Sequence, residues 1–64
     1  MAGRIKKLRA DRELSIRQLA EEAGLNRMAI SSWERSVTTP GVESVFRLAT
    51  FFDVSADYII GLDD

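Results

Sequence analysis

The side chains best suited to chemistry lie between residues 27 and 35. On a helical wheel at about 100° per residue, one arc is apolar and holds Ala29, Ile30 and Trp33. Such an arc predicts packing into a core. The opposite arc combines basic, short hydroxyl and flexible side chains, namely Arg27, Met28, Ser31, Ser32 and Arg35. Side chains of these kinds can contact the edges of bases, and the first turns of a short helix are enough to do so in a major groove.

Two helical segments must position this face. Ser15 and Gln18 form the S-x-x-Q pattern of a capping box. Gly24 stands where a helix end favours positive φ, and Asn26 is a good N-cap for the next segment. The pattern therefore predicts helices over residues 16–23 and 27–35 with a tight turn between them. Apolar spacing predicts three more helices at about residues 2–13, 41–52 and 56–61.

Helix 41–52 is expected to supply most of the core. Its apolar residues recur every three or four positions, which is typical of a buried helix face. We expect this core stripe to contain Val42, Val45, Phe46, Leu48, Ala49 and Phe52.

Length and composition exclude several classes of protein. Sixty-four residues indicate one domain. The absence of Cys and His removes thiolate metal sites and the commonest general base. The adjacent carboxylates Glu21 and Glu22 point about 100° apart on a helix, which favours a solvated face over acid–base work. We therefore expect no enzyme, no catalytic residue, no cofactor and no metal site. No signal peptide or long apolar run is present, so we expect no membrane partner and a cytoplasmic location.

The charge is unevenly distributed along the chain, although the net charge is only −1. Residues 1–42 carry eight basic and five acidic side chains, whereas residues 43–64 carry one basic and five acidic ones. The part with an excess of positive charge contains the polar face of residues 27–35. The acidic part includes residues 62–64. The net charge alone argues mildly against a nucleic-acid partner, but the distribution along the chain matters more than the sum.

Three segments in the right order resemble one family. Residues 18–35 read QLAEEAGLNRMAISSWER, residues 4–15 read RIKKLRADRELS, and residues 40–61 read PGVESVFRLATFFDVSADYIIG. Together they resemble the Cro and lambdoid phage repressor (XRE-type) helix-turn-helix family. The resemblance implies an all-α, compact five-helix bundle of the lambda-repressor-like type, with residues 1–64 as a single domain. It also implies a regulator of transcription, expected to be a repressor or its N-terminal DNA-binding domain, which reads double-stranded DNA through residues 27–35.

The resemblance further implies an ion pair between Arg9 and Glu34, which would fix an arginine near the DNA backbone. A DNA-bound homodimer on an inverted-repeat operator is also expected. The expected DNA contacts are the residues of the polar arc together with Arg9, Arg17, Thr38 and Thr39. The expected dimer contacts are Phe51, Val54, Ala56, Tyr58 and Ile59.

Several interpretations stay open at this stage. Met28 could contact a thymine methyl group, remain an exposed apolar residue or join a dimer. Phe51 could lie partly buried at the edge of the domain instead of in a dimer contact. The family commonly has Gln where this chain has Ile16, and Gly then Lys where it has Ser36 and Val37. These departures, with the acidic balance, support an alternative in which the chain kept the fold as a protein-interaction module but lost strong DNA binding.

Overall fold

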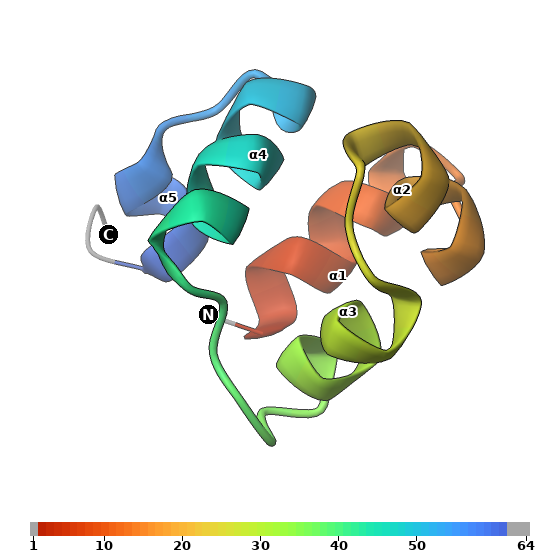
Figure 1. Ribbon diagram of the computed structural model, residues 1–64. Coiled ribbons are helices and arrows are strands. Elements are labelled where there is room, and N and C mark those ends of the chain that lie inside the picture. The colour runs from red at the N-terminus through yellow and green to blue at the C-terminus, as the bar shows by residue number, and fades with distance from the viewer. Residues whose placement is uncertain (1, 62–64) are drawn as a thin grey trace.

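The computed structural model describes residues 2–61, which form five α-helices joined by short loops (Figure 1). The helices are α1 (Ala2–Asp11), α2 (Ile16–Ala23), α3 (Arg27–Glu34), α4 (Val42–Phe52) and α5 (Ala56–Ile60). Met1 and the acidic stretch at residues 62–64 lie outside the described part. The predicted all-α five-helix architecture is confirmed over residues 2–61.

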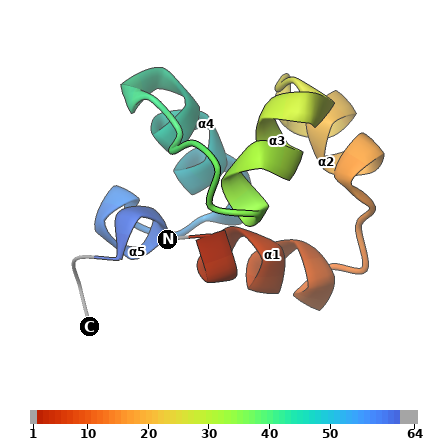
Figure 2. The same ribbon diagram turned by 90° about the horizontal axis from the view of Figure 1, so that it is seen from below.

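The helices are arranged so that α2 and α3 lie beside each other at one end of the molecule (Figure 2). Helix α1 contacts α3 along one side and α5 near the N-terminus, while α4 packs against α2 and α5. Both ends of the described chain therefore lie near α5, away from the turn between α2 and α3 (Figures 1 and 2).

All helix ends fall within two residues of the sequence prediction, and the differences have local causes. Helix α1 stops at Asp11, because Glu13 adopts φ 56° and the Leu14 amide returns to the Arg9 carbonyl at 3.0 Å. Helix α4 starts at Val42 because Gly41 is its N-cap, and α5 stops before Gly61, which adopts φ 82°. Left-handed backbone of this kind cannot continue a right-handed helix.

The core is formed by side chains from all five helices. Ile30 and Trp33 of α3 are both buried, as the apolar arc predicted. The buried apolar residues are Ile5, Leu19, Ala20, Ile30, Trp33, Val45, Leu48, Ala49, Phe52 and Ile59.

The prediction for α4 was wrong at two positions. Val42 and Phe46 are 74% and 60% exposed, although both were expected in the core stripe. The helix turns Val45, Leu48 and Phe52 towards the core, and Phe46 follows Val45 by about 100° around the axis. A spacing of three or four residues fits more than one face of an apolar helix, so contacts with the other helices decide which face is buried.

Candidate nucleic-acid interface

Local hydrogen bonds fix the two helices of the helix-turn-helix unit. The Ser15 hydroxyl accepts from the Gln18 amide at 3.0 Å, and the Gln18 side chain accepts from the Ser15 amide at 2.8 Å. Both halves of the predicted capping box are therefore present. Gly24 ends α2 in the left-handed conformation, with φ 71°, and the Asn26 side chain accepts from the Ala29 amide at 3.1 Å. The turn between the helices thus follows directly from the sequence.

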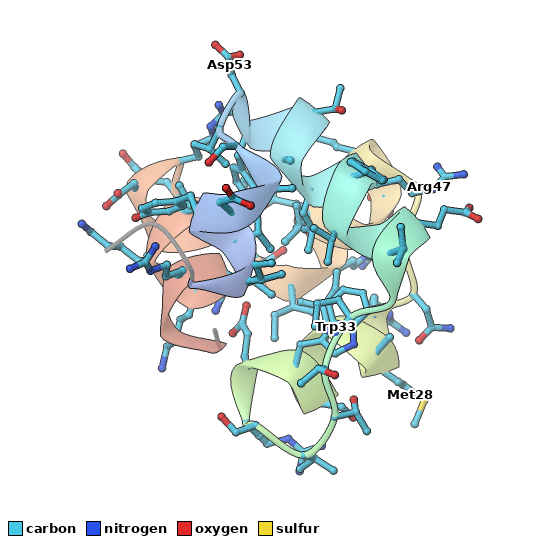
Figure 3. The ribbon with its side chains drawn as sticks, turned by 90° about the vertical axis from the view of Figure 1, so that its left-hand side faces the viewer. Met28, Trp33, Arg47 and Asp53 are labelled. Carbon is cyan, nitrogen blue, oxygen red and sulfur yellow. The ribbon has the colours of Figure 1, made fainter. Side chains whose placement is uncertain are left out.

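Helix α3 presents the polar arc to solvent. Arg27 and Arg35 are exposed, and Met28 is 80% exposed. Ser31 and Ser32 are half-buried along the same helix. Figure 3 shows Met28 projecting from the surface while Trp33 lies against the body of the protein. The face carries donors and acceptors of different lengths beside an apolar thioether, a combination that suits base edges and thymine methyl groups.

An ion pair anchors the far end of α3 to α1. The Arg9 guanidinium donates from Nε to Glu34 Oε2 at 2.8 Å and from Nη2 to Glu34 Oε1 at 2.9 Å. A third hydrogen bond, from Nη1 to the Leu14 carbonyl, measures 2.8 Å. Hydrogen bonding to Glu34 raises the pKa of Arg9 above its ordinary value, and burial opposes part of this shift. Paired arginine and carboxylate groups in this two-bond geometry fix orientation as well as distance.

The same geometry gives Arg9 a structural position. Its side chain is 16% exposed and that of Glu34 is 7% exposed. Three of the five N–H donors of the guanidinium are directed at Glu34 and Leu14. Arg9 therefore holds α1, the α1–α2 loop and α3 together, and its expected contact with DNA stays a prediction.

Arg17 and Arg27 are brought together at the surface. They line a shallow polar depression between α2 and the start of α3, with Asn26 and Leu25 between them. Arg17 also donates from Nε to Glu21 at 3.3 Å, in a pair whose side chains are 72% and 63% exposed. Exposed pairs of this kind contribute little to stability, so Arg17 can exchange Glu21 for an anion. Ile16, where the family commonly has Gln, instead lies partly buried against the core.

The loop after α3 is short and exposed. Ser36 adopts φ 61°, and the Val37 amide donates to the Ser32 carbonyl at 2.9 Å. Thr38 and Thr39 are both exposed next to Val37. Ser36 therefore adopts the left-handed backbone conformation at this helix end, where the family commonly has Gly.

The expected dimer contacts are less accessible than the sequence suggested. Ile59 has no exposed surface and belongs to the core, so its assignment as a dimer contact was wrong. A helix of five residues is too short for periodicity to separate its buried and exposed faces. The other four expected contacts, Phe51, Val54, Ala56 and Tyr58, are half-buried and pack at least partly within the chain.

Two arginines of the N-terminal segment have structural roles that sequence reasoning missed. Arg12 donates to the carbonyls of Phe51 and Phe52 at 3.2 Å each, at the C-terminal end of α4, and lies over both aromatic rings. Arg4 donates to the Tyr58 carbonyl at 3.0 Å, with its guanidinium carbon 4.5 Å from the centre of the Tyr58 ring. The available signal was that Arg12 continues the spacing of Ile5 and Leu8. The partners of Arg12, about 40 residues further along the chain, could not be inferred from spacing.

The described residues hold no group of three or more acidic side chains arranged to bind a metal ion. Over the same residues, no helix has both the length and the apolar character needed to cross a membrane.

Comparisons with known proteins agree with the geometry of α2 and α3. A family model described as helix-turn-helix matches residues 5–59. The chain is 36% identical over 61 residues to the uncharacterized HTH-type transcriptional regulator YobD of Bacillus subtilis, across 95% of this chain and 54% of that protein. It is 35% identical over 57 residues to the HTH-type transcriptional activator BcrR of Enterococcus faecalis, across 89% and 28% of the two chains.

A third relative is the HTH-type transcriptional regulator ImmR of Bacillus subtilis. It is 26% identical over 61 residues, across 95% of this chain and 48% of that protein. The chain thus spans about half or less of the length of these curated relatives. No solved structure matches it at comparable significance.

Proposed function

The chain belongs to the XRE-type helix-turn-helix family of DNA-binding regulators of transcription, and from this premise we propose that it reads a specific double-stranded DNA sequence by placing α3 in the major groove. The observation that carries the proposal is the exposed face of α3, whose orientation is set by Ile30 and Trp33 in the core and by the Arg9–Glu34 pair. A reading helix needs such fixed positioning, because discrimination between bases depends on hydrogen-bond geometry.

Each side chain of this face receives a role according to its chemistry. Arg27 contacts a base edge or a phosphate from the first turn, and Met28 packs against a thymine methyl group. Ser31 and Ser32 donate or accept hydrogen bonds, and Arg35 reaches the backbone or a base from the end of the helix. The mixture supports recognition of a defined sequence, since long basic side chains alone mainly contact phosphates.

Phosphate contacts are proposed on both sides of the reading helix. Arg17 and the N-terminal end of α2 approach one phosphate group, because free amides at a helix start attract anions. Thr38 and Thr39 approach another from the exposed loop after α3. Arg9 contributes by holding α3 in place.

We propose that the DNA-bound form is a homodimer on an inverted repeat. The longest extent of the chain is 27 Å, whereas successive half-sites on one face of DNA lie about 34 Å apart. One copy therefore covers one half-site, and a second copy is needed for the other.

The proposed direction of control is repression, and this rests on the resemblance to phage repressors. The chain acts either by itself or as the N-terminal DNA-binding part of a longer regulator. One relative carries the name of an activator. A reporter gene placed behind the selected operator therefore shows whether the chain lowers or raises transcription. Action on bacterial DNA implies a cytoplasmic location. We propose no catalytic activity and no cofactor.

The test is selection from a randomised duplex pool at several salt concentrations, followed by sequencing. We expect an enriched inverted repeat, with log affinity falling by about 0.9 per phosphate contact for each log unit of salt. No enrichment and no salt dependence at micromolar protein would overturn the proposal and favour the protein-interaction module. Exposed Met28 and Val37 would then be the first surface residues to examine.

A further inference from the structure

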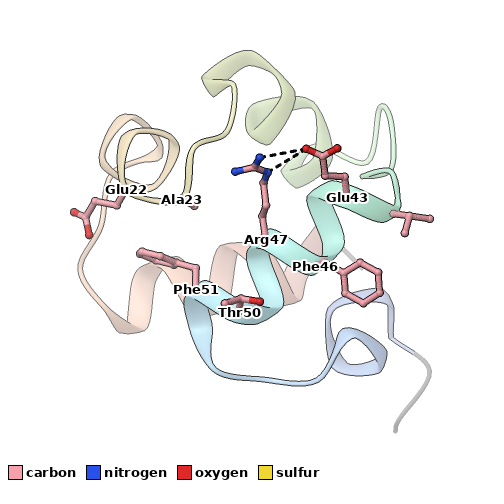
Figure 4. Close-up of a pocket in the computed structure, with 8 residues that line it drawn as sticks. Glu22, Ala23, Glu43, Phe46, Arg47, Thr50 and Phe51 are labelled. Carbon is pink, nitrogen blue, oxygen red and sulfur yellow. Dashed lines mark hydrogen bonds and ion pairs between the residues drawn. The ribbon is translucent and has the colours of Figure 1, made fainter.

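The outward side of α4 carries apolar side chains that no other described helix covers. Val42 and Phe46 are the exposed members, and Thr50 continues the same line one turn later. We name these three residues the outer stripe of α4. Phe46 and Thr50 also border a groove between α4 and the end of α2, and Figure 4 shows the Phe46 ring projecting outward on the side of α4 away from Phe51. Exposed apolar side chains that adjoin on one helix face form a candidate interaction surface.

Two opposite charges run beside the outer stripe. Glu43 and Arg47 lie one turn apart, with Arg47 Nη2 3.2 Å from Glu43 Oε1 (Figure 4). Their side chains are 83% and 49% exposed, so both remain open to another charged group. A uniformly acidic or basic partner would meet repulsion from one of the two residues. A partner that carries both charges in the reverse order can pair with both residues at once.

A second copy of this chain satisfies that requirement. When two α4 helices lie antiparallel about a two-fold axis, residues equidistant from the axis face each other. An axis beside residue 45 brings Glu43 of each copy opposite Arg47 of the other. It also brings the two Phe46 rings together and places each Val42 near the end of the other stripe. The charges and the apolar residues are thus self-complementary in one arrangement.

We propose that two copies of the chain pair through the outer stripe of α4, with Glu43 and Arg47 forming a four-charge network around the Phe46 rings. The proposal extends the proposed function and rests on it, because the paired form is taken to be the one that binds both half-sites. Helix α4 follows α3 after one short loop, so pairing there joins the two reading helices into one assembly.

The size of this surface predicts a weak dimer. One short helix face per copy falls below the standard interface, and small interfaces burying less than about 1,200 Å² usually belong to transient complexes. Association should therefore be measured up to about 1 mM protein, a concentration at which even a millimolar dissociation constant gives measurable dimer.

The first experiment is sedimentation equilibrium of the chain without DNA. We expect a reversible monomer–dimer equilibrium that Phe46→Glu weakens by at least about tenfold, because a charge replaces the central apolar contact. Val37→Glu is the matched control, since Val37 is 63% exposed and lies outside α4. Circular dichroism verifies that both variants are folded. A monomer at all concentrations, or equal weakening by the two variants, would overturn the proposal.

The second experiment uses the charge pattern and keeps Phe46 intact. Glu43→Arg leaves two basic residues beside the stripe, and Arg47→Glu leaves two acidic ones. Each variant alone should associate more weakly than the wild type because like charges face each other. An equimolar mixture should form heterodimers, since the two basic side chains of the first variant then oppose the two acidic side chains of the second. If the mixture associates no better than the separate variants, the antiparallel arrangement is wrong.

The outcomes separate this proposal from the one on DNA reading. Enrichment of a DNA sequence by a chain that never dimerises through α4 would leave DNA reading intact and remove the pairing surface. Dimerisation through α4 without any DNA enrichment would keep the pairing surface and remove the DNA function.

Discussion

The Arg9–Glu34 pair permits the most direct test of how α3 is held. Arg9→Met keeps much of the apolar length of the side chain but removes the hydrogen bonds to Glu34 and to the Leu14 carbonyl. The Glu34 side chain, 7% exposed, is then left without its charged partner. Removing one partner of a buried ion pair costs about 3–5 kcal/mol. Since Arg9 keeps some contact with solvent, we expect a loss near the lower limit, about 3 kcal/mol.

Such a loss is large for this chain. Typical stabilities of about 0.05–0.15 kcal/mol per residue give about 3–10 kcal/mol for a domain of this length. Arg9→Met should therefore populate the unfolded state detectably at room temperature. Glu34→Gln retains an acceptor oxygen and should cost less, about 1–2 kcal/mol. In the double variant, the loss should be smaller than the sum of the single losses by about 1 kcal/mol, because both changes break the same contact.

The assay is urea unfolding followed by the fluorescence of Trp33, the single tryptophan of the chain. Trp33 lies in α3 next to Glu34 and is buried in the folded state, so its emission reports on the element under test. Arg17→Met is the matched control, because Arg17 makes an exposed pair with Glu21 that should contribute at most about 0.5 kcal/mol. If Arg9→Met is no more destabilising than Arg17→Met, the pair does not hold α3 in place.

The pKa of Arg9 adds a condition on pH. The pKa of Arg9 is raised in the folded state. The charged guanidinium therefore contributes fully to the free energy of unfolding at every pH below the pKa of arginine in the unfolded state. This contribution is lost only at higher pH. The stability difference between wild type and Arg9→Met should therefore stay constant from about pH 7 to pH 9, where arginine remains charged in both states. A difference that falls across this range would indicate that another titrating group controls the contact.

Three further predictions concern helix ends and base reading. Ser36→Gly should raise the unfolding free energy by about 1 kcal/mol in urea titrations, because φ at Ser36 is 61°. Ser44→Gly inside α4 should instead lower the unfolding free energy by about 0.5 kcal/mol. Gly24→Ala should lower it by about 1–2 kcal/mol, because φ is 71° and an added Cβ would lie 3.0 Å from Arg47 Nη1; an unchanged urea midpoint would contradict the assigned backbone. Arg27→Ala should weaken binding to the selected operator by about 1–3 kcal/mol in titrations of labelled duplex. Lys7→Ala is the control, because it removes a charge from an exposed site on α1. It should leave the preferred DNA sequence unchanged. An operator affinity that survives Arg27→Ala would remove this residue from the reading role.

The parts of the fold that could be predicted are those decided by neighbouring residues. The Ser15–Gln18 capping box, the Asn26 cap and the left-handed Gly24 all depend on contacts within a few positions, and each is present. Glu13 shows the limit of this reasoning. Nothing in its side chain favours φ 56°, and the connection from α1 to α2 imposes that conformation.

The exposure of Phe46 and the burial of Ile59 depend on how helices meet, and the sequence does not specify this by spacing alone. Arg12 is a third example, because its contact with the end of α4 joins residues about 40 positions apart. For the candidate site, the sequence could indicate which side chains share the outer arc of α3. The sequence could not indicate that Arg9 would donate hydrogen bonds to Glu34 and to the Leu14 carbonyl at the same time.

The arrangement around α3 separates two kinds of mutational effect. Ile30, Trp33 and Glu34 connect the helix to the core and to α1, so changes there should alter stability and DNA binding together. Arg27 and Met28 project outward, so changes there should alter binding while leaving the unfolding free energy within about 0.5 kcal/mol. Because both groups occupy one short helix, the direction of each side chain around the helix axis decides its effect. A stability loss at Arg27 comparable to that at Glu34 would mean that the outer face of α3 is packed against the protein, and the proposed mode of DNA reading would then fail.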